Sequence, residues 1–326
     1  MSSKNVLITG VAGMIGSHLL DDLLERGYTV TGMDDLSYGS EANIVHRKTH
    51  PRFRFLNANV LDIDKLKSAA EGSQCIVHLA ALKKISEKEE AYPTLSVNAT
   101  GTENVLKVAR ELDIKVVFAS TSDVYGMSPD LPLNEDGDLL IGPSMIKRWS
   151  YAVSKLYGEQ MANAYYRDFG VPVVILRYFG AFSPRSNFSW SGGHIPIFIQ
   201  QVLKDEAITI HGDGSQTRSM GFVSDLVEGT RLAMESDLAI GEIINLGNDE
   251  ELSVLDSAKL IHSIAGTGKE LKLKFIPMAD IFGKYKDIMR RIPDLSKAKR
   301  LLGYSPQVSM QEAIRLTIHE AKKGMA

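Results

Sequence analysis

The chain has 326 residues, a formal net charge of −3, and 44% hydrophobic and 24% charged residues, the balance of an ordinary globular protein. This length allows one large or two modest domains, and the weak negative charge excludes the basic field that draws proteins to nucleic acid. The single cysteine, Cys75, excludes an internal disulfide, and no apolar run approaches the roughly 20 residues of a membrane span.

Residues 1–178 alternate between short apolar runs and longer segments with helical spacing. The first run, NVLIT, leaves no room for a signal peptide before it, so we expect a cytoplasmic protein. Strands are expected at residues 5–9, 28–34, 52–60, 75–80, 115–120 and 172–178. Helices are expected at 16–27, 64–72 (capped by Asp62), 96–113 and 150–170. Apolar strands that are each followed by a helix predict an α/β fold with a Rossmann-type, doubly wound parallel sheet.

Residues 179–326 have a different composition and a less regular pattern of strands and helices. The segment GAFSPRSNFSWSGGH is rich in glycine and serine and predicts a long functional loop. Helical patterns follow at 195–205, 223–236, 253–266 and 309–323, and strand-like runs at 207–212 and 241–248. We expect a smaller, mixed α/β substrate-binding lobe. The expected division is a Rossmann domain at 1–178, with 219–248 returning to it, and a second lobe at 179–218 and 249–326.

The turn after the first strand carries three glycines, Gly10, Gly13 and Gly16, in TGVAGMIGSHLL. Glycines allow a tight turn and let a pyrophosphate approach the backbone where the next helix begins. The second strand ends in Asp34, whose carboxylate can accept hydrogen bonds from both ribose hydroxyls and would repel a 2′-phosphate. The pattern therefore predicts NAD rather than NADP, and the adjacent Asp35 can share this role.

A tyrosine and a lysine stand four residues apart in YAVSK, at Tyr151 and Lys155. Side chains at i and i+4 lie on one face of a helix, so the two are neighbours. Because a nearby ammonium favours the phenolate, we expect the pKa of Tyr151 to be lowered toward neutrality. The pair predicts a general base.

Four motifs together are similar to those of a known family: GVAGMIG at the first turn, HLAA, STSDVYG and YAVSK. The chain resembles the extended short-chain dehydrogenase/reductases, and among them the NAD-dependent nucleotide-sugar epimerases, dehydratases and decarboxylases. The resemblance covers essentially the whole chain, including GDGSQTRS and RRIPDLSKAKRLLGYSP. It implies that NAD takes a hydride from carbon 4 of the sugar and later returns it.

The resemblance also implies roles for single residues. Tyr151 removes the substrate hydroxyl proton, Lys155 holds the nicotinamide ribose, and Thr121 hydrogen-bonds the reacting oxygen. Lys83 reaches a cofactor ribose, and Asn98 begins a helix near the cofactor. The residues implied to bind NAD are Gly10, Gly13, Met14, Ile15, Gly16, Asp34, Asp35, Asn59, Val60, Leu79, Ala80, Ala81, Lys83, Asn98, Tyr151, Lys155 and Tyr178.

Two phosphates on a nucleotide sugar require cations, and arginine binds phosphate through two parallel hydrogen bonds. By the resemblance, Arg218 and Arg291 hold the diphosphate, Arg185 reaches the diphosphate or the sugar, and Arg290 is a surface charge. Gly180 takes the place of an asparagine that touches the nucleotide sugar in relatives. A UDP-sugar is favoured, and the residues implied to bind it are Lys83, Thr121, Gly180, Arg185, Arg218 and Arg291.

The two residues after Thr121 bear on the reaction. Ser122 and Asp123 occupy positions where glucose dehydratases carry Asp-Glu and where mannose dehydratases and glucuronate decarboxylases carry Ser-Glu. The loop GPSMIKRWSYAVSK resembles the bacterial UDP-glucuronate decarboxylases. We therefore expect oxidation at carbon 4 and then chemistry at carbon 5 or 6, namely dehydration, decarboxylation or carbon-5 inversion. Asp123 would be the acid/base and Ser122 a helper donor.

Other functions stay open. A UDP-hexose or UDP-uronate 4-epimerase needs no further acid or base, and Asp123 would then cap a turn. A non-catalytic NAD-binding regulator usually lacks the Tyr-Lys pair, which disfavours that function. The identity of the sugar and of the nucleotide also stays open. The family pattern implies a homodimer through the Tyr151 helix and the Asn98 to Leu112 helix, and we expect no metal site and no nucleic-acid or membrane partner.

Overall fold

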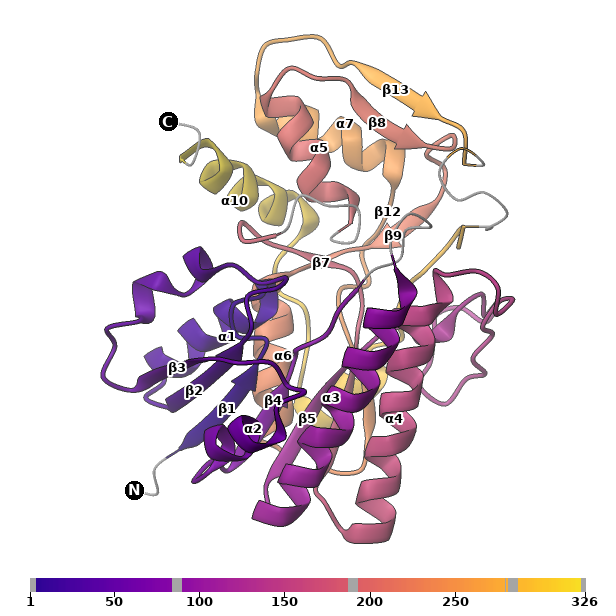
Figure 1. Ribbon diagram of the computed structural model, residues 1–326. Helices are drawn as coiled ribbons and strands as arrows, with labels where there is room; N and C mark the ends of the chain where they lie inside the picture. The colour runs from indigo at the N-terminus through magenta and orange to yellow at the C-terminus, as the bar shows by residue number, and fades with distance from the viewer. Residues whose placement is uncertain (1–3, 84–89, 187–192, 279, 281–286, 324–326) are drawn as a thin grey trace.

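The computed structural model describes residues 4–83, 90–186, 193–278, 280 and 287–323. These residues form a central parallel sheet of seven strands in the order β11-β6-β5-β4-β1-β2-β3, which confirms the predicted Rossmann-type architecture (Figure 1). The strands are β1 (Asn5–Thr9), β2 (Thr29–Asp34), β3 (Phe53–Asn57), β4 (Cys75–His78), β5 (Lys115–Thr121), β6 (Val173–Tyr178) and β11 (Ile243–Leu246).

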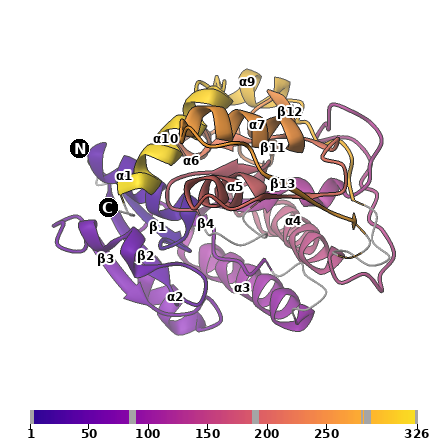
Figure 2. The ribbon, with the colours of Figure 1, turned by 90° about the horizontal axis from the view of Figure 1, so that it is seen from above.

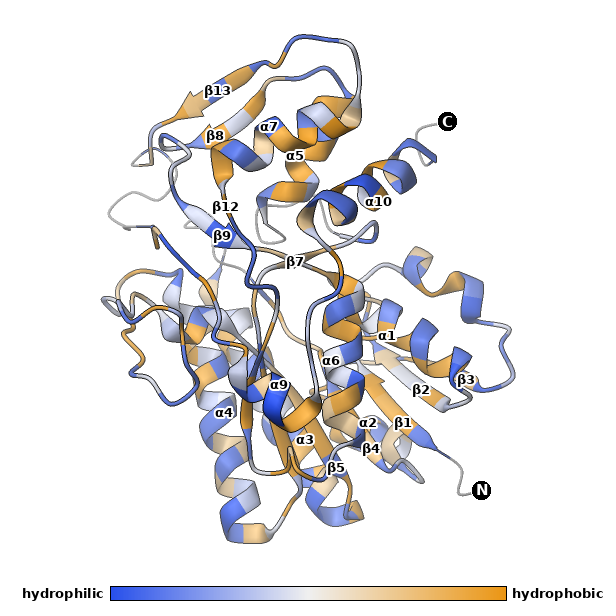
Figure 3. Ribbon diagram, turned by 180° about the vertical axis from the view of Figure 1, so that it is seen from behind, coloured by the Kyte–Doolittle hydropathy of each residue, from blue (hydrophilic) through white to orange (hydrophobic). Residues whose placement is uncertain are grey.

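Helices cover both faces of this sheet, as Figure 2 shows. One face carries α1 (Met14–Glu25) and α6 (Val223–Glu235), and the other carries α2 (Ile63–Ala70), α3 (Ala91–Leu112) and α4 (Trp149–Phe169). All six residues of β6 are buried, and Figure 3 shows hydrophobic colouring along the central strands. A strand covered by helices on both faces must be apolar throughout, which is why these runs do not alternate.

The single cysteine, Cys75, lies in β4 and is buried, and burial raises the pKa of its thiol to about 12. A buried thiol of this kind packs as a small apolar side chain. Among the described residues, no helix combines the length and the apolar character that crossing a membrane requires.

The second lobe lies above the carboxyl ends of the strands (Figure 1). Its helices are α5 (His194–Leu203), α7 (Val254–Ala265) and α10 (Met310–Lys323), packed beside the parallel pair β8 (Ile208–His211) and β13 (Leu273–Ile276). Two further pairs connect it to the sheet domain: β7 (Ala181–Phe182) with β10 (Gly221–Phe222), and β9 (Thr217–Ser219) with β12 (Glu251–Ser253). These short strands connect the second lobe to the sheet domain near the carboxyl ends of the sheet strands.

Two helices differ from their predictions. The helix expected at 96–113 begins at Ala91, and the helix α9 (Ser296–Leu302) was not predicted. The early start of α3 includes Pro93, which the first turn tolerates because its N–H groups have no partner within the helix. Because α3 begins early, Asn98 lies two turns inside the helix rather than at its start.

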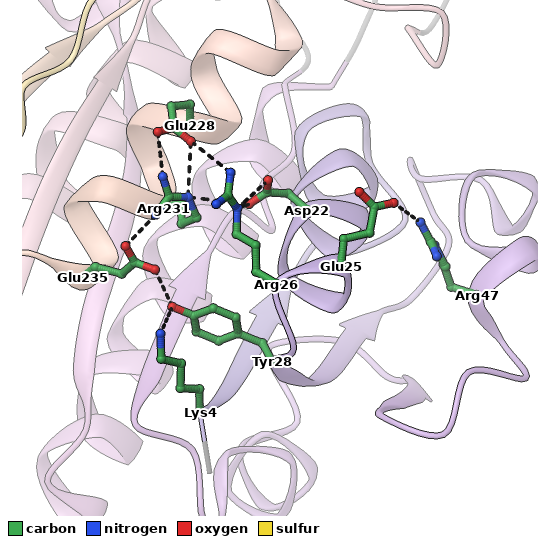
Figure 4. Close-up of polar contacts among 9 residues, drawn as sticks. All are labelled: Lys4, Asp22, Glu25, Arg26, Tyr28, Arg47, Glu228, Arg231 and Glu235. Carbon is green, nitrogen blue, oxygen red and sulfur yellow. Dashed lines mark hydrogen bonds and ion pairs between the residues drawn. The ribbon is translucent and has the colours of Figure 1, made fainter. Parts of the chain in front are cut away.

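An ion-pair cluster joins α1 to α6 (Figure 4). Arg231 pairs with Glu228 at 2.6 Å and with Glu235 at 2.5 Å, and its Nε lies 3.7 Å from Asp22 of α1. Tyr28 also donates to Glu235 at 2.5 Å. Since α6 packs on α1 and β11 pairs with β6, we propose the domain division expected from the sequence, with 219–248 belonging to the Rossmann domain.

Candidate active site

A cavity of about 1170 Å³ lies where the carboxyl ends of the central strands face the second lobe. Its sheet side includes Gly10, Asp34, Thr121 and Tyr178, and its lobe side includes residues of α5, β8 and β9. This is the position at which open parallel sheets bind their ligands. All residues predicted to bind cofactor or substrate line the cavity except Asn98.

The glycine loop forms one end of this cavity. Gly10 has a left-handed backbone with φ of 76°, and a Cβ there would lie 2.7 Å from the Ala80 nitrogen. Helix α1 begins at Met14, directly after Gly13, without a side-chain cap. Its first N–H groups are therefore available to an anion, which is the arrangement that binds a pyrophosphate.

We expect Gly16→Ala to weaken NAD binding by roughly 10- to 100-fold, the cost of inserting a methyl group into packed backbone. A Cβ at Gly16 would lie 2.2 Å from the Gly10 carbonyl oxygen, so the loop must move. Titration of the stripped protein with NAD measures the effect. The control is Gly137→Ala, at an exposed glycine outside the cavity, where the backbone is not left-handed and the atom nearest to a Cβ is the Asn134 carbonyl oxygen at 3.3 Å. Unchanged NAD affinity in Gly16→Ala would contradict the assignment.

Asp34 and Asp35 stand where the adenosine ribose is expected. The Asp34 carboxylate accepts hydrogen bonds from the backbone N–H groups of Ala12 and Leu36, each at 2.9 Å, and burial raises its pKa. Asn59 donates its amide to Asp35 at 2.5 Å. The acidic residue that ends β2 and the open helix start fit NAD, with the carboxylate on the ribose side and the backbone amides on the phosphate side.

The proposed reaction residues come from β5 and α4. β5 ends at Thr121, and a short 3-10 helix follows at Ser122–Tyr125, in which the Thr121 hydroxyl accepts from the Asp123 N–H at 3.2 Å. Tyr151 lies in the first turn of α4 and is 9% exposed, and the Thr121 hydroxyl hydrogen-bonds its phenol. Thr121 and Tyr151 therefore face one point in the cavity.

The expected lowering of the Tyr151 pKa is wrong for the structure described. Burial and the charge of Asp123 raise the pKa of Tyr151, and the Thr121 hydrogen bond offsets only part of the rise. Lys155 donates to the Ala119 carbonyl at 2.7 Å, and burial lowers its own pKa to about 7. The same burial therefore lowers the pKa of the Lys155 ammonium, which the spacing predicted as a partner, and raises the pKa of the Tyr151 phenol.

A buried ion pair joins β6 to α4, and a hydrogen bond from Ser120 connects the end of β5 to the same pair. Glu159 accepts two hydrogen bonds from Arg177 of β6, at 2.8 and 3.0 Å, and a third from the hydroxyl of Ser120. Both charged side chains are at most 4% exposed. Because every lone pair and donor in such a buried pair must be matched, the geometry of β5 next to Thr121 is tightly defined.

Asp123 lies beside Tyr151 among several cations. In the described part of the chain, Arg291 donates to its carboxylate at 2.6 Å, Lys83 lies 3.5 Å away and Arg148 lies 3.7 Å away. Burial alone would raise the pKa of Asp123, but the charges of Lys83, Arg291 and Arg148 outweigh it and hold the pKa well below its usual range. Asp123 is therefore ionised at neutral pH and has no proton to give.

Comparison with known proteins identifies the family. The family model described as GDP-mannose 4,6 dehydratase matches residues 7–317. The chain belongs to this family of extended short-chain dehydrogenase/reductases. It is an enzyme of the nucleotide-sugar epimerase, decarboxylase and dehydratase group.

Two curated relatives and one solved structure illustrate the similarity. The UDP-N-acetyl-alpha-D-glucosaminuronate decarboxylase of Bacillus cytotoxicus is 35% identical, over 97% of each chain. The UDP-glucuronic acid decarboxylase 1 of Danio rerio is 38% identical, over 97% of this chain and 72% of the relative. The UDP-glucuronic acid 4-epimerase of Bacillus cereus, solved with UDP-glucuronic acid and NAD, has a TM-score of 0.88 at 31% identity, covering 98% of this chain and 99% of that one.

In this family member, each of the three arginines predicted to bind substrate is held by a carboxylate. Arg291 pairs with Asp123, Arg218 pairs with Asp287 at 2.9 Å, and Arg185 pairs with Asp21 of α1 at 2.7 Å. Arg291 therefore lies at the Tyr151 end of the cavity, while Arg185 bridges to the Rossmann domain. Arg290 is exposed and pairs with Glu251, as a surface charge would.

One cofactor prediction needs correction in this dehydrogenase/reductase fold. Asn98 does not line the cavity, because its amide is used by the Leu82 backbone at 2.8 and 2.9 Å and by the Ser154 hydroxyl at 2.9 Å. It supports the segment that carries Lys83. The Lys83 ammonium lies beside Asp123 and 5.4 Å from the centre of the Tyr151 ring, at the reaction end of the cavity, and its contact with a cofactor ribose stays a prediction.

The structure also explains why residue 180 is a glycine. A Cβ at Gly180 would lie 2.4 Å from the Met220 sulfur, so Met220 fills the space that a side chain at residue 180 would need. Sequence reasoning missed Arg148 as a site residue. Its spacing could have revealed it, because Arg148 directly precedes α4, and Arg148, Tyr151 and Lys155 are separated by three and four residues, the spacing of one helix face. His194 and His211 also line the cavity and were not predicted.

Proposed function

We propose that this enzyme is an NAD-dependent decarboxylase of a UDP-uronate, which forms a ketone at carbon 4 and then loses carbon 6 as CO2. The observation that carries the proposal is the ionised Asp123, which lies among Arg291, Lys83 and Arg148 next to the proposed base Tyr151. A sugar carboxylate at this position meets cations that can hold it and an anion that repels it. The curated relatives named as uronate decarboxylases support the same choice.

Oxidation begins at the hydroxyl on carbon 4. Tyr151 takes the hydroxyl proton, while Thr121 hydrogen-bonds the same oxygen and orients it. Bound NAD supplies the redox chemistry: it accepts a hydride from carbon 4 and later returns one. The pKa of Tyr151 must fall for this step, and a positively charged group held near the phenol, which the oxidised cofactor would supply, would act in that direction.

The loss of CO2 follows from the ketone. A carboxylate on carbon 5 is then β to a carbonyl, so the carbon–carbon bond can break with its electron pair entering an enolate at carbons 4 and 5. Tyr151 and Thr121 stabilise the enolate oxygen, and Asp123 raises the free energy of the carboxylate it faces. Carbon 5 then takes a proton from solvent. We therefore assign Asp123 an electrostatic role, in place of the acid/base role suggested by the sequence.

A 4-epimerase acting on the same uronate is the second candidate. The similarity to the UDP-glucuronic acid 4-epimerase of Bacillus cereus favours it. Such an enzyme must keep the carboxylate, and the hydrogen bond between the Asp123 N–H and Thr121 would then make Asp123 a turn residue. Dehydration across carbons 5 and 6, carbon-5 inversion and a non-catalytic role rank lower, because no observation at the site favours them.

The test is incubation of the NAD-loaded protein with UDP-glucuronate and with UDP-N-acetylglucosaminuronate in heavy water, followed by NMR. We expect CO2, a UDP-pentose or its amino analogue, and one solvent deuterium at carbon 5. Inversion at carbon 4 without exchange would support the epimerase instead. Protein carrying Tyr151→Phe is the control for background decarboxylation.

We also propose a cytoplasmic homodimer. Among the described residues, Tyr92 and Leu95 of α3 and Val153 and Tyr157 of α4 are exposed hydrophobic side chains on two helices that lie side by side (Figure 2). Lys107 of α3 lies near Tyr157, which places the two helices' exposed faces together. Pairing with a second copy would form a four-helix contact that buries these side chains.

We expect Tyr157→Asp to convert the dimer to a monomer, because a carboxylate at an apolar interface loses its hydration without gaining a partner. Size-exclusion chromatography with light scattering measures the mass. The control is Leu238→Asp, at a side chain that is 73% exposed and lies outside α3 and α4. A dimer that persists in Tyr157→Asp but dissociates in the control would place the interface elsewhere.

A further inference from the structure

A short segment, residues 287–291, contacts both ends of the cavity. At its first residue, Asp287 pairs with Arg218 at 2.9 Å, where the diphosphate is expected. At its last residue, Arg291 donates to Asp123 at 2.6 Å, beside the proposed base. All four residues line the cavity, and their side chains are at most 19% exposed. The expected diphosphate end and the reaction end are therefore joined by five consecutive residues.

The residues between these two ion pairs are fixed to neighbouring elements. Ile288 is buried in an apolar cluster with Trp149 of α4, the helix that carries Tyr151. The backbone N–H groups of Thr217 and Ser219 in β9 donate to the carbonyl oxygens of the third and fifth residues of the segment, at 2.9 and 3.3 Å. The segment is therefore a packed unit, and a shift at one end is transmitted to the other.

The ion pair at Arg218 competes with a diphosphate for the same guanidinium. A phosphate bound through two parallel hydrogen bonds needs two guanidinium nitrogens. In the structure, one terminal nitrogen of Arg218 donates to Asp287 and the other donates to the Thr217 carbonyl. The Asp287 carboxylate would also repel a phosphate beside it. Binding of a diphosphate at Arg218 therefore opposes the pair between Arg218 and Asp287.

We propose that residues 287–291 couple the two ends of the cavity, so that a diphosphate that displaces Asp287 from Arg218 also weakens the hold of Arg291 on Asp123. The inference rests on the proposed function, since it assumes a nucleoside diphosphate beside Arg218. An Arg291 guanidinium released in this way can pair with the substrate carboxylate once the substrate is anchored. Because coupling between two sites is reciprocal, weakening the pair at Asp123 must favour binding of the diphosphate.

The test is a double-substitution cycle on the affinity for UDP, which carries the diphosphate and lacks the sugar that Asp123 faces. Calorimetry on the NAD-loaded protein gives the Kd values. We expect the Kd for UDP to fall by about 3- to 10-fold in Asp287→Asn, which removes the competing charge, and in Asp123→Asn, which weakens the distant pair. With both substitutions, the Kd should match that of Asp287→Asn within about twofold, because the link between the ends is already broken.

A direct charge effect gives a different pattern. If Asp123 acted on the diphosphate only through space, its neutralisation would tighten UDP binding by the same factor with and without the Asp287 carboxylate, and the coupling would be refuted. An unchanged Kd in either single variant would refute it as well. Uridine, which has no phosphate, should bind every variant within about twofold of the unsubstituted protein. The matched control is Asp249→Asn, at an exposed carboxylate outside the cavity, which should leave the Kd for UDP unchanged.

Retained NAD affinity shows that a variant is folded, and Asp287→Ser, which also removes the charge, must reproduce the result of Asp287→Asn. Independent effects of the two substitutions on UDP binding, together with CO2 release from UDP-glucuronate, would refute the coupling and leave the proposed function standing. If the unsubstituted protein bound no UDP, both the coupling and the proposed function would fail.

Discussion

Replacing Tyr151 with phenylalanine should lower kcat by about 10²- to 10⁴-fold, the usual contribution of a positioned acid–base group. The hydroxyl is the group that faces Thr121 and takes the substrate proton, and phenylalanine keeps the ring that packs in the cavity. NAD affinity should change little, because Gly10, Asp34 and the start of α1 are untouched. Turnover of the UDP-uronate, measured by CO2 release under saturating substrate, gives the comparison.

The matched control is Tyr166→Phe. Tyr166 lies on the same helix, is 37% exposed and does not line the cavity. The loss of its hydroxyl should leave kcat within about twofold of the unsubstituted protein, as for a surface substitution. Full activity in Tyr151→Phe would show that another group removes the proton, and Lys155, with a pKa of about 7, would become the candidate.

Asp123→Asn is the second substitution for which we expect a large effect. It should lower both KM and kcat, each for its own reason. Asparagine keeps the size of the side chain and removes its charge, so the substrate carboxylate no longer meets an anion between Arg291, Lys83 and Arg148. We expect KM to fall, because the ground state is no longer repelled, and kcat for CO2 release to fall by about 10²-fold. Both constants come from one series of initial rates.

The control is Asp136→Asn, since the Asp136 side chain is 87% exposed and does not line the cavity. A purely structural role for Asp123 would lower the Tm and raise KM, which is the opposite of the expected KM change. If Asp123→Asn released CO2 at the unsubstituted rate, the decarboxylase mechanism would lose its central residue, and the 4-epimerase would become the better proposal.

The sheet could be predicted from the sequence because its strands are apolar on both faces and its helices repeat with their own period. These are local patterns, and the glycine loop and the Tyr-Lys spacing are local as well. The start of α3 was missed because a proline in the first turn looks like a break. Helix α9 was missed because its seven residues are too few to show a clear period.

The charge pattern of the site could not be predicted in the same way. Arg291 is 168 positions from Asp123 in the sequence, and Arg185 is 164 from Asp21. Such pairs arise only when the lobe folds over the sheet. The pKa of Tyr151 shows the same limit, because spacing reveals a neighbouring lysine but not the burial that acts on both groups.

The buried thiol of Cys75 has a practical consequence for measuring the assembly. The chain contains one cysteine, and a buried thiol whose pKa is raised to about 12 is unreactive toward alkylating probes. A cysteine introduced in place of Leu238, which is 73% exposed and lies outside α3 and α4, would therefore be the one thiol to accept a spin label, without prior replacement of Cys75. The distance between two such labels would report directly on the geometry of the paired α3 and α4 helices.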